Sequence, residues 1–417
     1  MQQIMLIRVT GDDRPGLTAG LTEVLAHHHV DVVDVNQAVI HRQLLLGMLI
    51  RMPGDINAAM VLGELQMQAS QWEMRLSARV VSADEYEAWV ARQGKPRHIL
   101  TLLARTMTGA RLAAVSRTIA DQGMNIDVIT RLTGRPPLVA REGPQRACVE
   151  LSVRGEPADA DGFHAELMRI SRELDCDVAW QEDNAYRRVR RLVAFDMDST
   201  LIQAEVIDEL AREAGVGDEV AAVTEAAMRG ELDFGASLRR RVGLLKGLDE
   251  AALKRVAQRL ELTEGAEHLI GQLRRLGYKT AIISGGFSYF GEVLRQRLGI
   301  DYVCANELEI EHGRLTGRVI EPIVDGQRKA ELVREIAGRE GIRLEQVIAV
   351  GDGANDLPML NQAGLGIAFH AKPVVQDAAE HQISTLGLDG ILYLLGVRDR
   401  DLPAYAPPTS EHAPVRR

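Results

Sequence analysis

The sequence predicts a multidomain protein in which two small α+β domains precede a larger α/β domain. Three observations predict this organisation. The element order β-α-β-β-α-β occurs twice in the first half of the chain. In the second half, short apolar strands alternate with helices, which is typical of a parallel sheet covered on both faces. A long and almost wholly helical stretch, residues 204–258, separates the first of these strands from the next.

Composition narrows the classes of function. A chain of 417 residues exceeds one ordinary core, and its net charge of -10 argues against nucleic acid as a general partner. Its three cysteines (Cys148, Cys176 and Cys304) are widely spaced and odd in number, which excludes a disulfide framework and a C-x-x-C metal site. The N-terminal residues lack a signal-peptide layout, and no apolar run approaches about 20 residues. We therefore expect a soluble cytoplasmic protein that does not act at a membrane.

The first domain is expected at residues 1–94. A turn-forming segment, Gly11–Gly16, separates its first strand from an amphipathic helix. The element order is that of a two-layer α+β sandwich of the ferredoxin-like kind. The expected strands are Ile4–Val9, Val30–Val35, Leu44–Arg51 and Trp72–Val81, and the expected helices are Leu17–His27 and Ile56–Met67.

The second domain is expected at residues 95–183, where the same order recurs. An internal repeat of roughly 90 residues accounts for this, with residues 93–96 as the linker. A polar, proline-rich loop at residues 134–146 joins two of its strands. The expected strands are Ile99–Ala104, Ile126–Leu132, Ala147–Val153 and Cys176–Gln181, and the expected helices are Leu112–Gln122 and Phe163–Leu174.

The third domain is expected at residues 184–399, as a three-layer α/β fold of the Rossmann-like kind. It follows a joint at residues 183–191 that carries four arginines. A nucleic-acid-binding arm would need such charges, but we interpret the joint as a solvated linker. Residues 400–417 contain four prolines and no apolar period, so we expect a disordered tail. The expected elements are strands Leu192–Phe195, Tyr278–Ile283, Gln346–Val350 and Leu365–Phe369, a hairpin at Tyr302–Val324 and a helix at Lys329–Gly338.

Polar segments follow three of the buried strands. Asp196–Thr200, Ser284–Gly286 and Gly351–Asp356 would meet at one edge, because the carboxyl ends of parallel strands lie together. Asp196 and Asp352, with Asp356 as a further carboxylate, would give the oxygen-rich site that Mg²⁺ prefers. Any one of these segments alone is often an ordinary turn. Their joint occurrence at strand ends predicts a functional site.

The chemistry predicted for this edge is phosphoryl transfer. The Ser284 hydroxyl and the amides of Gly285 and its neighbour would form an anion nest, and the ammonium of Lys329 would add a phosphate clamp. Asp196 is a competent nucleophile that would form an aspartyl-phosphate. Asp198, two residues on, would protonate the leaving alkoxide and then accept a proton from water.

The segment Asp13–Leu17 resembles the ACT domain, a small-molecule sensing module, and the second copy has Thr108–Ala110 at the corresponding place. The resemblance implies that such modules pair and bind an amino acid at the pair interface. It implies a homodimer, with serine or another amino acid as regulator. The positions that we assign to regulation on this basis are Asp13, Gly16, Gly109 and Asn125.

The four motifs of residues 196–200, 284–286, 329 and 351–356 resemble those of haloacid dehalogenase-type phosphatases, and within them the phosphoserine phosphatases. The resemblance covers roughly residues 191–396. It implies a metal held by Asp196, Asp352 and the main-chain carbonyl of Asp198, with Asp356 in a supporting role. It also implies that Asn355 contacts the phosphate. Met197 stands where phenylalanine is common, a swap within apolar residues.

The helical cap carries further matches to this family. The resemblance implies that Glu205 holds the ammonium of O-phospho-L-serine and that Arg241 holds its carboxylate, while Met228 and Phe234 pack nearby. A selective pocket for this substrate needs an anion for the amine and a guanidinium for the carboxylate. Arg239 or Arg240 would replace Arg241 if the register differs by one or two residues.

The function predicted from these motifs is the Mg²⁺-dependent hydrolysis of phosphoserine to serine and phosphate, the last step of serine biosynthesis, under feedback by serine. Two alternatives stay open. One is a phosphatase of another phosphomonoester or of a phosphoprotein. The other is a catalytically silent amino-acid sensor, which the intact motifs disfavour.

Overall fold

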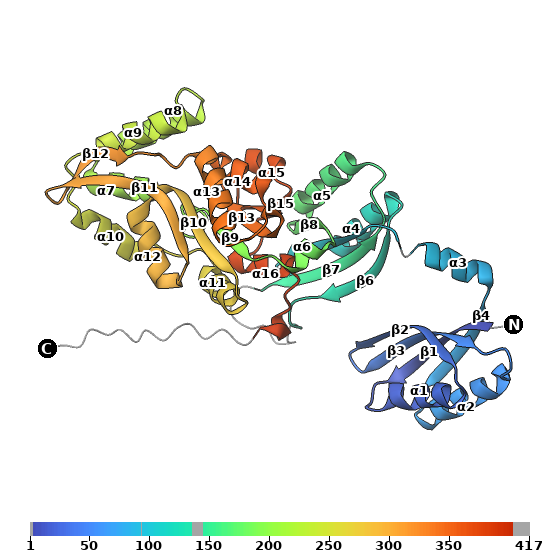
Figure 1. The fold of residues 1–417 in the computed structure, drawn as a ribbon. Helices are drawn as coiled ribbons and strands as arrows, with labels where there is room; N and C mark the ends of the chain where they lie inside the picture. The colour runs from blue at the N-terminus through green and yellow to red at the C-terminus, as the bar shows by residue number, and fades with distance from the viewer. Residues whose placement is uncertain (1–2, 93, 136–144, 403–417) are drawn as a thin grey trace, which may run out of the picture. The chain divides into compact units, whose positions relative to one another are not determined.

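The computed structural model describes residues 3–92, 94–135 and 145–402 of the chain (Figure 1). The chain divides into two compact units, residues 1–95 and residues 96–417. The first unit holds one α+β domain. The second holds another α+β domain together with the α/β domain. Within the described residues, no helix is long and apolar enough to cross a membrane.

The first α+β domain is a four-stranded antiparallel sheet in the order β2-β3-β1-β4, covered by two helices. Leu21 and Leu25 of the first helix and Val61 and Leu65 of the second are fully buried against the sheet. Gly16 precedes the first helix with φ +90°, a conformation that glycine adopts without steric cost. The elements are β1 Gln3–Asp12, α1 Leu17–His27, β2 Asp31–Ile40, β3 Gln43–Met52, α2 Ala58–Gln71, β4 Arg75–Val81 and α3 Ala83–Ala91.

The second α+β domain repeats this architecture with the sheet order β6-β7-β5-β8. Its own core lies between the sheet and two helices and includes Leu100, Leu102, Val115 and Phe163. The ferredoxin-like fold predicted for both domains is confirmed. The elements are β5 Arg97–Ala104, α4 Gly109–Asp121, β6 Asn125–Arg131, β7 Ala147–Arg154, α5 Ala160–Leu174 and β8 Asp177–Glu182.

The other face of this second sheet is buried as well. Leu103 of β5 and Ala179 of β8 belong to the same hydrophobic cluster as Val193 and Phe195 of the α/β domain. Successive side chains of a strand point to opposite faces, so alternate residues of β5 serve two different cores. The second α+β domain is therefore joined to the α/β domain by apolar packing.

The α/β domain is built on a seven-stranded sheet in the order β12-β11-β10-β9-β13-β14-β15. The central strand, β9 (Leu192–Phe195), pairs in parallel with β10 on one side and β13 on the other. The predicted α/β fold with a three-layer arrangement is confirmed. The other strands are β10 Lys279–Phe287, β11 Tyr302–Glu311, β12 Arg314–Ile320, β13 Val347–Gly351, β14 Leu365–Phe369 and β15 His381–Ile383.

The two faces of this sheet carry separate cores. Val193 and Phe195 of β9 pack with helices α11 and α12, whereas Leu192 and Ala194 of the same strand pack with α13 and α14. This alternation makes β9 apolar at every position, as expected for a strand buried on both faces. The covering helices are α11 Ala266–Arg275, α12 Ser288–Leu298, α13 Gly326–Arg339 and α14 Leu357–Gln362.

A helical cap is inserted between β9 and α11, as predicted. The β11–β12 hairpin reaches this cap, because Leu315 exchanges backbone hydrogen bonds with Gly247 and Leu248 at 2.8 and 2.9 Å. The cap is therefore linked to the sheet by the hairpin as well as by its own chain. Its helices are α7 Val206–Ala214, α8 Gly217–Met228, α9 Phe234–Leu244 and α10 Ala251–Arg259.

The arginine-rich joint is not a solvated linker, and that interpretation was wrong. Residues 185–188 form a short helix, α6 (Ala185–Arg188). Arg187 is buried and donates to Glu150 at 2.6 Å, and Arg190 is buried and donates to Gln181 at 3.0 Å. One nitrogen of each guanidinium, Nη2, thus finds a partner on the second α+β domain, while Nε of both and Nη1 of Arg190 have none among the described residues.

Other differences are local. Ser284–Gly286 was predicted as a loop but lies within β10, where the pairing with β11 shifts register. Helix α3 and strand β15 were not predicted. Residues 136–144 of the predicted polar loop and residues 403–417 of the predicted tail lie outside the described residues, while Asp399–Asp401 forms a 3-10 turn.

Candidate active site

The loop that follows β9 places Asp196 at the carboxyl edge of the sheet. Its backbone N–H donates to the carbonyl of Val350 in β13 at 2.8 Å, which continues the sheet pairing by one residue. One carboxylate oxygen, Oδ1, accepts from the backbone N–H of Met197 at 2.7 Å. The other, Oδ2, lies 2.9 Å from Nζ of Lys329. The predicted nucleophile is thus fixed by the backbone on one side and by an ammonium on the other.

Lys329 lies in the first turns of α13 and is fully buried with two carboxylates. Its Nζ is 2.9 Å from Asp196 and donates to Oδ1 of Asp356 at 2.6 Å. Oδ2 of Asp356 accepts from the backbone N–H of Gly353 at 2.9 Å. Burial opposes the charged ammonium, but the charges of Asp196 and Asp356 outweigh it and raise the pKa of Lys329. A permanent cation therefore stands at the site.

Asp196, Asp352 and Asp356 each offer a carboxylate oxygen, and the three oxygens lie within 4.8 Å of one another. Thr200 donates its hydroxyl to Oδ1 of Asp352 at 3.0 Å. Burial and the charge of Asp196 raise the pKa of Asp352 to about 7, and burial with the same charge raises the pKa of Asp356 to about 7.

The donors in this cluster fit a hard divalent cation. They are all oxygen atoms, and the strain of the like charges would be relieved by an added positive ion. The predicted ligands are the carboxylates of Asp196 and Asp352 and the main-chain carbonyl of Asp198, with Asp356 in support. The third carboxylate of the cluster is that of Asp356. The carboxylate of Asp198 points to a different set of contacts.

Asp198 is buried beside the second motif. Its Oδ1 accepts from the backbone N–H of Val206 at 3.3 Å. A Cβ added at Gly286 would lie 2.4 Å from its Oδ2, so only glycine permits this approach. Burial raises the pKa of Asp198 well above its ordinary value, and the charges of Glu205 and Asp196 add to the shift. A carboxyl group held neutral in this way is able to donate a proton.

The segment Ser284–Gly286 is held in place by its own hydrogen bonds and by Asn306. Ser284 is fully buried, and its Oγ accepts from the backbone N–H of Gly286 at 2.9 Å. Asn306, in β11, donates to the carbonyl of Gly285 at 2.7 Å and accepts from the backbone N–H of Val324 at 2.8 Å. The orientation of the predicted anion nest therefore depends on a residue of the neighbouring strand.

The cap presents Glu205 and Arg241 to the same region. Ser199 donates its hydroxyl to Oε1 of Glu205 at 2.9 Å. Glu205 keeps contact with solvent, but the protein atoms crowded around it raise its pKa, and the charge of Asp196 adds to the shift. Arg241 has a buried Nε without a hydrogen-bond partner. Burial lowers the pKa of Arg241, while the charges of Glu205 and Asp208 oppose this.

The remaining cap residues differ in placement. The ring of Phe234 lies against the second motif, because a Cβ added at Gly285 would come within 2.7 Å of its Cζ. Met228, at the end of α8, is 67% exposed and is not brought against the others. Arg239 is paired with Glu321 at 2.7 Å, and Arg240 is exposed. Arg241 is therefore the one of the three neighbouring arginines with a buried, unpaired donor.

The predicted phosphate-contacting and regulatory residues lie on turns and element ends. Asn355 is half-buried in a 3-10 turn, Ala354–Asp356, beside the metal cluster. Asp13 is exposed in the turn before Gly16. Gly109 is the first residue of α4, and Asn125, the first residue of β6, donates to Asp127 at 2.8 Å.

Sequence reasoning missed three residues that organise the site: Ser199, Thr200 and Asn306. Ser199 and Thr200 were visible, since they belong to the first motif and carry short hydroxyls. Ser199 also has φ +55°, a conformation that is rare for residues other than glycine and that collects at functional sites. Asn306 carried no local signal, because its role depends on the pairing of β11 with β10.

Comparisons with known proteins agree with this geometry. A family model of haloacid dehalogenase-like hydrolases matches residues 193–361, and two ACT-domain models match residues 3–79 and 96–181. The chain is 42% identical to a phosphoserine phosphatase of Streptomyces coelicolor, over 96% of this chain and 94% of that protein. The chain belongs to the phosphoserine phosphatase family of haloacid dehalogenase-like hydrolases. The two α+β domains are its ACT domains, and the α/β domain is its phosphatase domain.

Further relatives support the same assignment. A phosphoserine phosphatase of Mycobacterium tuberculosis is 42% identical over 96% of this chain and 95% of its own. Among solved structures, a haloacid dehalogenase-family hydrolase from Salmonella enterica serovar Typhi has a TM-score of 0.62 at 34% identity, covering 71% of this chain and 98% of its own. A probable phosphoserine phosphatase from Vibrio cholerae has a TM-score of 0.56 at 35% identity, covering 72% and 86%. The predicted family, fold class and enzyme class are thereby confirmed.

Proposed function

We propose that this enzyme hydrolyses O-phospho-L-serine to L-serine and phosphate through an aspartyl-phosphate on Asp196, as the last step of serine biosynthesis. The observation that carries the proposal is the different surroundings of two neighbouring carboxyl groups. Asp196 lies 2.9 Å from the Lys329 ammonium, whereas burial raises the pKa of Asp198 well above its ordinary value. One group is prepared to attack phosphorus and the other to donate a proton.

The proposed sequence of steps follows from these positions. Asp196 attacks the phosphorus, and Asp198 gives its proton to the departing serine oxygen. Asp198, now ionised, then takes a proton from the water that hydrolyses the acyl phosphate. The Ser284 hydroxyl, the Gly285 amide and Asn355 would orient the phosphate, and the Lys329 ammonium would balance its negative charge in the transition state.

We also propose Mg²⁺ as the cofactor, with Asp196, Asp352 and the main-chain carbonyl of Asp198 as its ligands and Asp356 in support. When bound, the cation supplies positive charge to the phosphoryl oxygens. Its support is the fit of an oxygen-only cluster with raised carboxyl pKa values. Ser284, Gly285 and Asn355 would orient the phosphate beside the cation.

Selectivity for phosphoserine is assigned to the cap. Glu205 would meet the substrate ammonium, and the guanidinium of Arg241, whose buried Nε has no hydrogen-bond partner, would meet the carboxylate. Phe234 would pack beside the substrate over Gly285. Met228 is retained as a substrate contact only for a closed form of the cap, since its side chain is exposed here.

The test is phosphate release from a panel of phosphomonoesters and a phosphopeptide, with and without Mg²⁺. We expect phosphoserine to be preferred and turnover to require the metal. Asp196→Asn should lower turnover on the order of a thousandfold or more. Arg241→Ala should lose phosphoserine turnover selectively. Equal turnover of all esters by the parent enzyme would favour the alternative substrate class, and turnover by Asp196→Asn would remove the proposed nucleophile.

For regulation, we propose that serine binds at the ACT domains through the turns that carry Asp13, Gly16, Gly109 and Asn125, and that it lowers activity. Inhibition requires a second site and a second state of the enzyme. Serine titration of the intact enzyme and of Asp13→Ala, at fixed substrate, tests this. An unchanged inhibition constant in the variant would remove Asp13 from the site.

A homodimer and a cytoplasmic location complete the proposal. The edge strand β2 of the first ACT domain exposes Val32, Val35 and Ile40, which would be covered by a second copy. The three free cysteines, two of them buried, suit a reducing compartment. Light scattering of the purified chain measures the oligomer, and a fluorescent fusion in cells reports the location.

The domain limits proposed are residues 1–94, 95–183 and 184–399, with the cap at about 204–258. The division into units at residue 95 supports the first limit. Limited proteolysis followed by mass spectrometry tests it, because an exposed connection is cut before a packed one. We expect the first cut between residues 92 and 96.

A further inference from the structure

The cap is joined to the phosphatase domain by two chain crossings that run side by side. The outgoing crossing is residues 200–205 and the return crossing is residues 260–265. Ile202 and Leu262 form an antiparallel bridge between them. Thr263 donates its backbone N–H to the carbonyl of Leu201 at 3.0 Å. Any movement of the cap over the site must bend both crossings together.

The outgoing crossing is continuous with the nucleophile loop. The backbone N–H groups of Leu201 and Ile202 both donate to the carbonyl of Met197, at 2.9 and 3.1 Å. Met197 lies between the two catalytic carboxylates. A restraint on the return crossing is therefore passed, through two hydrogen-bonded steps, to the residues that flank Asp196 and Asp198.

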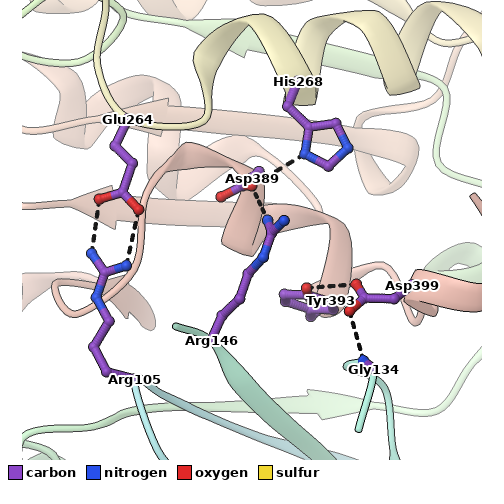
Figure 2. A network of polar contacts seen from close by, with 8 residues as sticks. All are labelled: Arg105, Gly134, Arg146, Glu264, His268, Asp389, Tyr393 and Asp399. Carbon is purple, nitrogen blue, oxygen red and sulfur yellow. Dashed lines mark hydrogen bonds and ion pairs between the residues drawn. The ribbon is translucent and has the colours of Figure 1, made fainter. Parts of the chain in front are cut away.

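A residue of the second ACT domain holds the return crossing from outside. Arg105, in the segment between β5 and α4, makes a bidentate pair with Glu264, with Nη1–Oε1 at 2.9 Å and Nη2–Oε2 at 2.8 Å (Figure 2). The hydrogen bond from Arg105 lowers the pKa of Glu264. The two side chains are 38% and 45% exposed, yet the forked geometry gives this pair a fixed direction that a single surface contact lacks.

A second group of contacts fixes the end of the same crossing. Asp389 accepts from Arg146 of the second ACT domain and from Nδ1 of His268 in α11, the latter at 3.2 Å (Figure 2). A Cβ added at Gly265 would lie 2.6 Å from Oδ1 of Asp389, so the crossing is packed directly on this carboxylate. The carbonyl of Glu264 also accepts from the backbone N–H of Leu388 at 2.8 Å.

We propose that Arg105 is a positioning residue of the phosphatase: through Glu264 it fixes the return crossing, and so the second ACT domain sets how readily the cap closes on the substrate. The inference rests on the proposed function, in which Glu205 and Arg241 of the cap read the amino-acid end of phosphoserine. The segment that bears Arg105 runs directly into Gly109. A ligand bound at that turn would therefore act on the same contact.

The expected effect of loosening the crossing falls on substrate capture. If a smaller fraction of the enzyme has its cap in the closing-competent position, the apparent affinity falls by that fraction, while the chemistry inside a closed site is unchanged. We expect Arg105→Ala to raise KM for phosphoserine about three- to tenfold, with kcat kept within about twofold. A small ester without amino or carboxylate groups, such as p-nitrophenyl phosphate, should keep its KM within about twofold.

Arg172→Ala is the matched control. Arg172 of the second ACT domain pairs with Asp377 of the phosphatase domain at 3.1 Å, so it is also an exposed contact between these two domains, but it does not touch either crossing. We expect this variant to behave as the parent enzyme on both substrates. Hydrogen exchange of the peptide covering residues 260–265 should speed up in Arg105→Ala and not in Arg172→Ala.

A charge exchange separates a specific pair from a general loss of docking. Arg105→Glu alone should raise KM at least as far as the alanine variant, and adding Glu264→Arg should restore it. The proposal would be overturned if Arg105→Ala left KM unchanged or raised it equally for both esters. It would also be overturned if Arg105→Ala and Arg172→Ala had equal effects, or if the charge-exchanged pair did not recover KM. If the parent enzyme did not turn over phosphoserine, the proposed function would be rejected instead. Hydrogen exchange of residues 260–265 would still decide whether Arg105 holds the return crossing.

Discussion

The two ACT domains have the same element order and the same sheet order, but they use their sheets differently. In the first, β1 alternates between buried and accessible positions and β4 is mostly exposed. In the second, β5 is buried at every position after Arg97, and β8 is buried along most of its length. Strands β5 and β8 are buried on both faces because the phosphatase domain covers one of them, whereas the edge strand β6 is mostly exposed. One fold thus serves as a separate module in one copy and as a wall of the catalytic unit in the other.

Polar contacts reinforce this difference. Between the second ACT domain and the phosphatase domain, buried donors and acceptors are matched across the boundary, which fixes one relative orientation. They add direction to an apolar contact that by itself has none. The pairs are Asp177 with Ser384 and Thr385, Gln181 with Leu394, Ser171 with Gln382, and Trp180 with His381. Gly134 and Asp399 form an exposed pair across the same boundary.

Removing one ACT domain at a time tests this difference most directly. A chain of residues 96–417 keeps the whole second unit, so we expect phosphoserine turnover within about twofold of the intact enzyme. A chain of residues 184–417 exposes the apolar surface that Leu103 and Ala179 cover, so we expect a Tm lower by more than about 10 °C or loss of soluble protein. Calorimetry and phosphate release measure both. Equal stability of the two truncated chains would contradict the distinction.

A smaller effect is expected from Asp177→Ala. Asp177 is fully buried in β8 and accepts from the backbone N–H groups of Ser384 and Thr385 at 2.8 and 2.9 Å. Removing the Asp177 carboxylate leaves these buried N–H donors without an acceptor, so the free energy of unfolding should fall by about 2–4 kcal/mol. Arg79→Ala, on strand β4 of the first ACT domain, breaks only an exposed pair with Glu85, so the free energy of unfolding should stay nearly unchanged. Urea titration of each variant gives the comparison.

His381 should make the stability of the second unit depend on pH. His381 is buried, and its Nε2 donates to the carbonyl of Trp180 at 2.9 Å. Burial lowers the pKa of His381, and the positive charge of Arg190 lowers it further. The unfolded chain, with a pKa of about 6.5, takes up a proton that the folded chain resists. The contribution of His381 to stability is therefore lost as pH falls below about 6.5, by at most about 1.4 kcal/mol per pH unit. Asp352 and Asp356, whose pKa values are raised to about 7, contribute in the opposite direction over this range.

His381→Gln keeps a donor toward Trp180 but does not titrate, so between pH 7.5 and 5.5 it should lose less stability, or gain more, than the parent enzyme as pH falls. The same pH dependence of the free energy of unfolding in His381→Gln and in the parent enzyme would contradict a contribution from His381.

The smallest effect on stability is expected on the open strand of the first ACT domain. Val35 is 51% exposed on β2, so Val35→Lys should change the free energy of unfolding by about 0.5 kcal/mol or less. The same change should shift the proposed dimer toward monomer, which light scattering detects. An unaltered oligomer would place the dimer contact elsewhere.

Local patterns in the sequence were enough to predict the strands that carry the site. The apolar run Leu192–Phe195 predicted a doubly buried strand, and strand-end chemistry brought Asp196, Lys329, Asp352 and Asp356 to one edge. The similar run Ile99–Ala104 was predicted only as a strand of the second two-layer α+β domain, although the structure buries both of its faces. What covers the second face depends on a surface formed by residues far along the chain, which no local pattern specifies.

The remaining misses have different physical causes. The capping box of α3, Ser82 with Glu85, was readable in the sequence but was passed over. The burial of Arg187 and Arg190 was hidden, since charge in a joint normally favours water and only the partners Glu150 and Gln181 reverse this. Strand β15 has three residues, too few for a period to emerge.

The bridge between Ile202 and Leu262 also bears on how the chain assembles. The central strand β9 must pair with β10 across the whole cap. Closing so long a loop costs chain entropy before strand pairing stabilises the sheet. Once the two crossings are paired, the cap becomes a closed side loop, and the path from β9 to β10 shortens to the crossings and α11. If this bridge formed early in folding, the sheet could form as though the cap were absent, and the cap could fold independently of it.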